Sequence, residues 1–279
     1  MNNNLSFNHF ITRAVQPLID KGFENAKNEI IWYLESLRIC TREQIYLDEI
    51  ILNDKLQSNI QIFYNQRIRG VPFQYILQKS NFYGRDFYIN QHTLIPRPET
   101  ELFIDSLKPS FFKDALEIGT GSGVLAITLS LEKIINKIIA TDISISALSV
   151  AKKNLDSFNL SNISLQQHDF LNQTFKKKFD LIISNPPYIS YPEYHQLSKE
   201  IIDHEPKIAL TDKKDGLSFY LRFAETLRDI LKLDGTFLCE MGSAQSVPLI
   251  KKIFLDRGYT IKIHKDLNLD ERILQINLS

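Results

Sequence analysis

Features that mark secreted, membrane-bound and nucleic-acid-binding proteins are scarce in this sequence. Only Cys40 and Cys239 occur in 279 residues, too few for a disulfide framework and not in the spacing of a metal site. The 33 basic and 33 acidic residues cancel, so we expect no stable binding to nucleic acid or to a membrane. No apolar run is long enough to cross a bilayer, and the opening residues lack the basic and apolar regions of an export signal. We therefore expect a cytoplasmic protein without a metal.

The hydrophobic pattern changes along the chain and divides it into three parts. In residues 1–72, apolar residues recur at helical spacing, which predicts a small helical bundle. Residues 73–96 contain short aromatic and β-branched runs on either side of Gly84, which predict a β-hairpin connector. Residues 97–279 alternate apolar runs with helical segments and predict an α/β domain.

The α/β domain is expected to contain a parallel sheet. Its apolar runs are nearly continuous and separated by helices, a pattern typical of parallel strands covered on both faces. The expected strands are 115–118, 137–141, 164–167, 179–184 and 236–240. The tail from Tyr259 has two short runs with no room for a crossover helix, so we expect it to form a closing antiparallel pair.

A glycine-rich turn follows the first of these strands. Gly119, Gly121 and Gly123 are spaced G-x-G-x-G. The dinucleotide fingerprint requires G-x-G-x-x-G and meets Val124 at its third glycine position, so this sequence does not match it. Glycines let the backbone approach a ligand closely, and open α/β sheets bind ligands at the carboxyl ends of their strands. The turn therefore predicts a site for a nucleoside-containing ligand.

Acidic and aromatic residues follow the next two strands. Asp142 can accept hydrogen bonds from both hydroxyls of a ribose, or it can cap the following helix. Asp169 can accept from an adenine amino group, and Phe170 can stack on the base or belong to the core. Because three successive strand ends each suit one part of an adenosine, we predict an adenosine-containing cofactor.

The tetrapeptide Asn185-Pro186-Pro187-Tyr188 follows the fourth strand, at the same edge of the sheet. Proline has no N–H, so the loop is stiff, and the Pro186 carbonyl and the Asn185 oxygen can hold both hydrogens of an amide or aromatic amino group. Tyr188 can stack on that planar group. The nitrogen is a poor nucleophile, so catalysis requires alignment with a sulfonium methyl and stabilisation of the developing charge. The motif predicts methyl transfer from S-adenosylmethionine without a general base or metal, the alternative being an ordinary strand-to-loop turn.

The chain resembles the HemK/PrmC family, the glutamine N5-methyltransferases that modify peptide-chain release factors. Besides the glycine turn, the resemblance rests on the segments 69–76, 82–84, 94–101 (LIPRPETE), 185–189, 204–206 and 215–217. It implies a seven-stranded, Rossmann-like S-adenosylmethionine methyltransferase domain behind a helical substrate-recognition domain. Gln78 and Lys213-Lys214 stand where the family usually has glycine, which puts the local loop geometry in doubt.

The resemblance also implies roles for individual residues. The expected catalytic residues, which would bind the substrate glutamine, are Asn185, Pro186, Pro187 and Tyr188. With Asp169 added from the strand-end pattern, the expected cofactor residues are Gly119, Thr120, Gly121, Ser122, Gly123, Asp142, Asp169, Phe170 and Asn185.

These observations lead to one hypothesis and three alternatives for function. The hypothesis is S-adenosylmethionine-dependent methylation of N5 of the glutamine in the Gly-Gly-Gln motif of bacterial release factors. A ribosomal-protein glutamine methyltransferase matches the segment 94–101 less well, and a nucleic-acid adenine N6-methyltransferase needs a basic groove that the neutral charge does not indicate. The intact Asn-Pro-Pro-Tyr motif argues against the third alternative, an inactive cofactor-binding scaffold.

Overall fold

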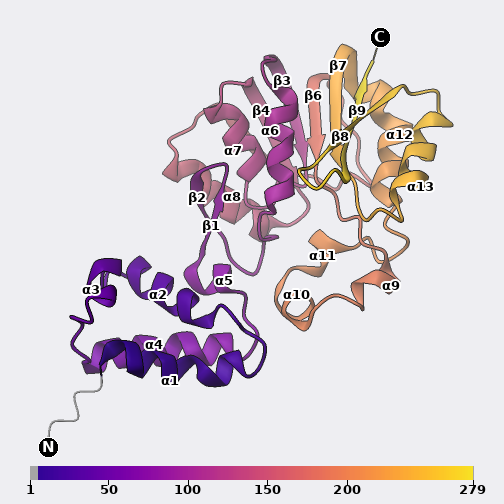
Figure 1. The fold of residues 1–279 in the computed structure, drawn as a ribbon. Coiled ribbons are helices and arrows are strands. Elements are labelled where there is room, and N and C mark those ends of the chain that lie inside the picture. The colour runs from indigo at the N-terminus through magenta and orange to yellow at the C-terminus, as the bar shows by residue number, and fades with distance from the viewer. Residues whose placement is uncertain (1–5, 279) are drawn as a thin grey trace, which may run out of the picture. The chain divides into compact units, whose positions relative to one another are not determined.

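The computed structural model describes residues 6–278, which form two compact units (Figure 1). The first unit contains residues 6–79 and 199–204, and the second contains residues 80–198 and 205–278. The chain therefore returns to the first unit late in its course. The division at residue 79 falls inside the segment that the sequence predicts to be a connector.

The first unit is entirely helical up to the start of β1. Its helices are α1 Phe7–Ile19, α2 Ala26–Ser36, α3 Arg42–Tyr46, α4 Asp54–Arg67, α5 Phe73–Leu77 and α10 Lys199–His204. Helices α1 to α5 enclose a core of apolar side chains such as Phe7, Leu34 and Phe63. The spacing of these residues along each helix buries one face, as an amphipathic pattern requires.

A buried arginine attaches α10 to the rest of this unit. The Arg67 guanidinium on α4 donates to Glu29 on α2 (Nε to Oε2, 2.7 Å) and to Glu200 on α10 (Nη1 to Oε1, 2.9 Å). Arg67 is buried and Glu200 is partly buried. A guanidinium presents several donors in a fixed plane, so one side chain can hold two acidic partners from distant parts of the sequence.

The hairpin expected around Gly84 consists of β1 Lys79–Phe82 and β2 Arg85–Tyr88. Its two-residue turn is Tyr83-Gly84, and both residues have positive φ (50° and 73°), as a type I′ turn requires. The Glu101 carboxylate accepts the Tyr83 N–H at 2.7 Å, which fixes the turn to the second unit.

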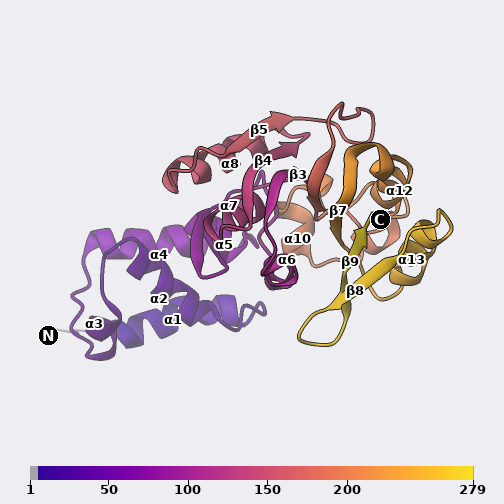
Figure 2. The same ribbon diagram turned by 90° about the horizontal axis from the view of Figure 1, so that it is seen from above.

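The predicted parallel sheet and its closing antiparallel pair are confirmed. The seven strands lie in the order β5-β4-β3-β6-β7-β9-β8, and Figure 2 shows β5 and β8 at opposite ends. The strands are β3 Phe112–Ile118, β4 Ile135–Asp142, β5 Ile163–Gln167, β6 Phe179–Ser184, β7 Leu231–Glu240, β8 Ile261–Lys265 and β9 Glu271–Asn277. β3 pairs with β4 on one side and β6 on the other, so the strand order reverses between β3 and β6. Open α/β sheets bind ligands at such a point.

Helices cover both faces of this sheet (Figure 1). Alternate residues of the inner strands enter separate cores, one shared with α6, α7 and α8 and the other with α12 and α13. The helices of the second unit are the 3₁₀ helix η1 Pro98–Glu101, then α6 Leu102–Leu107, α7 Val124–Leu131, α8 Ile145–Ser157, α9 Tyr191–Tyr194, α11 Lys207–Leu210, α12 Ser218–Ile230 and α13 Val247–Leu255. Within residues 6–278, no helix is long and apolar enough to cross a membrane.

Candidate active site

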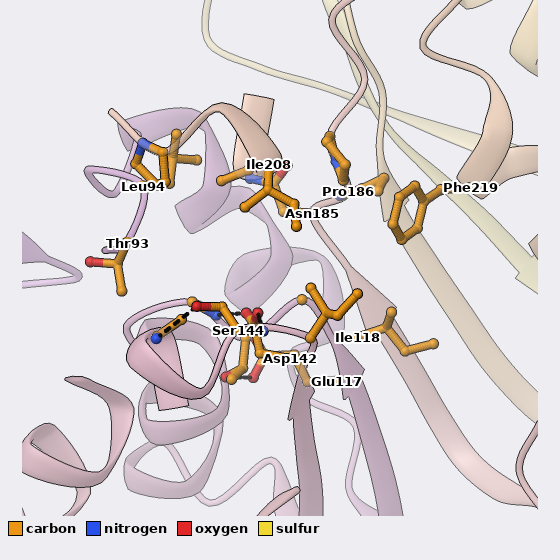
Figure 3. Close-up of a pocket in the computed structure, with 18 of the residues that line it drawn as sticks. Thr93, Leu94, Glu117, Ile118, Asp142, Ser144, Asn185, Pro186, Ile208 and Phe219 are labelled. Carbon is orange, nitrogen blue, oxygen red and sulfur yellow. Dashed lines mark hydrogen bonds between the residues drawn. The ribbon is translucent and has the colours of Figure 1, made fainter. Parts of the chain in front are cut away.

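A cavity of about 300 Å³ lies at the carboxyl ends of the central strands, within the second unit. A volume of this size is typical of small-molecule sites. In Figure 3, Glu117, Asp142 and Ser144 gather on one side, and Leu94 and Ile208 lie across from them. Of the expected site residues, the cavity wall includes Gly119, Thr120, Gly121, Ser122, Asp142, Asp169, Phe170, Asn185, Pro186 and Pro187. Gly123 and Tyr188 are not part of the cavity wall.

The glycine turn folds tightly between β3 and α7. Gly119, Gly121 and Gly123 all have positive φ (77°, 57° and 83°), a conformation that side chains disfavour. Gly123 does not line the cavity, because it packs against α8: a Cβ there would lie 3.3 Å from the Ala151 Cβ. Its physical role is the close approach of α7 to α8.

Asp142 holds the glycine turn in place and still faces the cavity. Its Oδ2 accepts the Gly121 N–H at 2.9 Å, and its Oδ1 accepts the Ser144 N–H at 2.9 Å. Ser144, not Asp142, caps α8, because its hydroxyl accepts the Ala147 N–H. Asp142 is therefore not the helix cap. Burial raises the pKa of its carboxyl group, and each oxygen retains acceptor capacity for a ligand.

Glu117 is a cavity residue that the sequence pattern does not reveal. It occupies an otherwise apolar strand, and its side chain is only 2% exposed. Its Oε2 accepts a hydrogen bond from the Thr120 hydroxyl at 2.6 Å. Burial raises the pKa of Glu117 to about 8. An isolated acid in a buried strand is the signal that would have identified it.

Phe170 and Asp169 form another part of the wall. Phe170 is 4% exposed and packs against Phe223 at 4.5 Å between ring centroids, so it belongs to the core and lines the cavity at once. The two Asp169 carboxylate oxygens accept from the Leu171 N–H and the Asn172 side chain. These local bonds fix the Asp169 carboxylate in position.

His168 presents an unsatisfied polar atom beside these residues. Its ring stacks on Phe175 at 4.0 Å, and its Nε2 is buried without a hydrogen-bond partner among the described residues. Burial lowers the pKa of the imidazole, which favours the neutral ring. Buried polar atoms are normally paired, so this nitrogen is an exception within a residue that lines the cavity.

The Asn-Pro-Pro-Tyr loop leads from β6 along the cavity. Asn185 Nδ2 donates to the Thr100 hydroxyl at 3.1 Å, which leaves Oδ1 as the available acceptor of its side chain. Tyr188 does not line the cavity: its hydroxyl donates to Glu240 Oε1 at 3.3 Å, and burial raises its pKa. Because Tyr188 is not part of the cavity wall, the predicted stacking on a substrate requires its ring to reach the substrate from the far side of the Asn-Pro-Pro-Tyr loop.

The segment LIPRPETE supports this loop through distant contacts. Arg97 Nη2 donates to Glu205 Oε1 at 2.6 Å, and Glu205 Oε2 accepts the Ile95 N–H at 3.2 Å. The Thr100 hydroxyl donates to Glu240 Oε2 at 2.8 Å. Neither Thr100 nor Glu240 is distinguished by local sequence, because their partners lie far along the chain.

Both departures from the family pattern fall on left-handed backbone. Gln78 ends α5 with a φ of 53°, and Lys213 has a φ of 63°. Glycine adopts this conformation without steric cost, whereas other residues do so at a cost of about 1 kcal/mol. Gln78 and Lys213 thus adopt a backbone conformation that glycine would adopt more easily.

Comparisons with known proteins agree with this geometry. The methyltransferase small domain family model matches residues 98–212. The release factor glutamine methyltransferase of Bacillus subtilis is 41% identical over 74% of this chain and 75% of that protein. The bifunctional methyltransferase of Rickettsia bellii is 37% identical over 98% of this chain and 55% of the relative, so the chain spans about half the length of such relatives. A crystal structure of a methyltransferase from Pyrococcus furiosus has the same fold, with a TM-score of 0.54 and 21% identity over 79% of this chain and 98% of that one.

Proposed function

Since the chain belongs to the release factor glutamine methyltransferase family, we propose that it transfers a methyl group from S-adenosylmethionine to N5 of the glutamine in the Gly-Gly-Gln motif of bacterial release factors. The observation that best supports this is the position of Asn185, whose free Oδ1 lies beside a nucleoside-sized cavity. Release factors act in translation termination, so this function implies the cytoplasm.

The cavity fits the adenosine part of the cofactor. Asp142 retains one acceptor lone pair on each oxygen, the number that two ribose hydroxyls need. The Phe170 ring offers an apolar face for a base. When bound, S-adenosylmethionine supplies an electrophilic methyl group on a sulfonium centre.

Asn185 and Pro186 act on the substrate nitrogen. The Asn185 Oδ1 and the Pro186 carbonyl accept its two hydrogens and hold it in line for attack. Positive charge develops on this nitrogen as the new bond forms, and both acceptors stabilise it before one proton is lost to water. Fixed acceptors supply this stabilisation without reorganisation of solvent.

The helical unit is proposed to recognise the release factor outside its target loop. All described residues that line the cavity belong to the second unit, so the first is available for another role. Tyr46 and Ile51 are 80% and 82% exposed, which provides apolar surface for a protein partner. Binding energy from such remote contacts can hold one flexible glutamine in the reactive geometry.

Mass spectrometry of three incubations tests the proposed function. Protein and S-adenosylmethionine are mixed with a release factor, a ribosomal protein or an adenine-containing RNA. We expect one added methyl group on the Gly-Gly-Gln peptide of the release factor alone. The Asn185→Ala variant should react ~100-fold more slowly, because one preorganised contact is lost. An unmodified release factor, or methylation of the RNA instead, would overturn the proposal.

A further inference from the structure

A hydrogen-bond network holds the side chain of Asn185 and runs from Thr100, in the cavity wall, to the buried Glu240. We propose that Thr100 and Glu240 are positioning residues that fix the rotation of the Asn185 amide, so that its oxygen faces the substrate nitrogen. This inference rests on the proposed function and adds two residues that act on the substrate through Asn185.

The direction of each hydrogen bond follows from the number of available protons. A hydroxyl has one hydrogen, and Thr100 donates it to Glu240 Oε2 at 2.8 Å. The Thr100 oxygen can then only accept a hydrogen bond from Asn185, and the Asn185 atom able to donate is Nδ2, at 3.1 Å. The opposite amide rotamer would place two acceptors against each other, so the network excludes it.

The two supporting residues are buried, and Glu240 has further hydrogen-bond donors. Glu240 is 1% exposed and Thr100 is 4% exposed. Tyr188 donates to the second carboxylate oxygen, and Tyr220 donates to the Glu240 carbonyl at 2.8 Å. In such surroundings a charged acceptor polarises the chain of hydrogen bonds and makes the Asn185 oxygen a stronger acceptor.

The charge state of Glu240 decides whether the arrangement persists. Burial raises its pKa to about 7, opposed by hydrogen bonds from Thr100 and Tyr188. Other titratable groups either affect the pKa of Glu240 or have a pKa that Glu240 affects: Arg272, Glu99, Tyr220 and Cys239. Once protonated, Glu240 can donate a hydrogen bond to the Thr100 oxygen. The Thr100 hydroxyl is then free to donate to the Asn185 side chain, so the amide is no longer held in one orientation. The turnover number kcat should therefore fall as pH decreases through about 7.

Substitutions at Thr100 separate positioning from packing. Thr100→Val keeps the shape but lacks the hydroxyl, and we expect kcat at saturating cofactor and substrate to fall roughly tenfold or more. Thr100→Ser should restore most of kcat, and the affinity for S-adenosylmethionine should change much less than kcat in both variants. Thr236→Val is a matched control, because Thr236 is also a buried hydroxyl that accepts from an asparagine amide, Asn277 at 2.8 Å. Equal kcat for Thr100→Val and the parent, or an equally impaired Thr100→Ser, would refute the inference.

Nuclear magnetic resonance provides a test that needs no turnover. The Asn185 side-chain amide resonances can be assigned by comparison with Asn185→Ala. In the parent they should shift with pH, with a midpoint of about 7, and in Glu240→Gln they should stay constant. They should also move in Thr100→Val. If the parent shows this titration but does not methylate release factor, the proposed substrate fails and the network stands. If the resonances change neither with pH nor in Thr100→Val, the network assignment is wrong, whichever substrate the protein methylates.

Discussion

At the scale of single residues, the cavity wall uses side chains whose hydrogen-bonding capacity is shared between the fold and a ligand. In Asp142, one oxygen accepts the Gly121 N–H and the other accepts the Ser144 N–H, so each oxygen keeps a lone pair for a ligand. A bound ribose would use the remaining lone pairs of Asp142, which is a physical reason for affinity.

Replacing Asp142 with alanine should weaken binding of S-adenosylmethionine. Loss of a charged acceptor for two hydroxyls corresponds to roughly 1.5–3 kcal/mol, or about ten- to a hundredfold in affinity. Isothermal titration calorimetry measures this directly. Asp266→Ala is a suitable control, because Asp266 also accepts two backbone N–H groups, those of Asn268 and Asp270, but lies outside the cavity wall. Unchanged affinity in Asp142→Ala would remove this residue from the site.

At the scale of elements, the Asn-Pro-Pro-Tyr loop is held by the segment that precedes α12. Asp212 accepts from the backbone of Lys214, Gly216 and Ser218, which folds this segment into a compact turn. Gly216 has a φ of 79°, and a Cβ there would collide with the Tyr188 carbonyl. The glycine thus permits direct backbone contact between the two segments.

Gly216→Ala should therefore destabilise the protein and displace the loop. The φ conflict costs about 1 kcal/mol, and the collision adds ~1–3 kcal/mol. Gly84→Ala separates the two effects, because Gly84 has a φ of 73° but open space around its Cβ position. Urea unfolding should give a clearly larger loss for Gly216→Ala than for Gly84→Ala. Equal losses would show that the contact with Tyr188 is not tight.

At the scale of the whole molecule, two buried carboxyl groups connect stability to pH. Burial raises the pKa of Glu117 to about 8 and that of Glu240 to about 7. The folded protein therefore keeps protons that the unfolded chain releases near its ordinary pKa of about 4.5. Folding takes up protons in this window, so these groups lower the free energy of unfolding as pH rises from about 4.5 to the folded pKa.

Replacing Glu117 with glutamine should make stability less dependent on pH. The amide oxygen can still accept from Thr120, but the side chain no longer titrates. The free energy of unfolding of the variant relative to the parent should increase between pH 5 and pH 8, by at most about 1.4 kcal/mol per pH unit. Denaturant titrations at several pH values measure the difference. Parallel curves for the two proteins would contradict the buried-acid interpretation.

The division into two units leads to a prediction about substrate recognition. The double substitution Tyr46→Ala with Ile51→Ser should lower kcat/KM for whole release factor, because contacts to the partner are lost. Activity on a short Gly-Gly-Gln peptide should not change, since the peptide does not reach this surface. Leu267→Ser, also on a fully exposed apolar residue but in the second unit, is the control and should affect neither substrate. Equal loss on both substrates would indicate a role other than recognition.

These contacts also show why deletion of the N-terminal residues is a poor experiment. α10 belongs to the first unit and is tied to it by Arg67. Removal of the preceding helices would leave Glu200 without this partner. Surface substitutions keep the fold intact and test recognition alone.

The sequence by itself determined the order of elements and the edge of the sheet where the site lies. Continuous apolar runs and helical spacing are local properties, and the carboxyl ends of parallel strands meet at one edge. The sequence therefore sufficed to predict that Asp142 and Asn185 lie at the same edge of the sheet, because each stands at the end of a strand. The same pattern correctly predicted the antiparallel pair β8 and β9.

The tertiary structure alone decided which side chains support that site and how they point. Thr100 lies 85 residues from Asn185 and 140 from Glu240, so no sequence period connects them. Glu117 is hidden within an apolar strand, and Tyr188 turns toward Glu240 because a buried carboxylate there needs donors. Hydrogen-bond direction depends on the three-dimensional positions of all partners at once, and the sequence specifies these only through the complete fold.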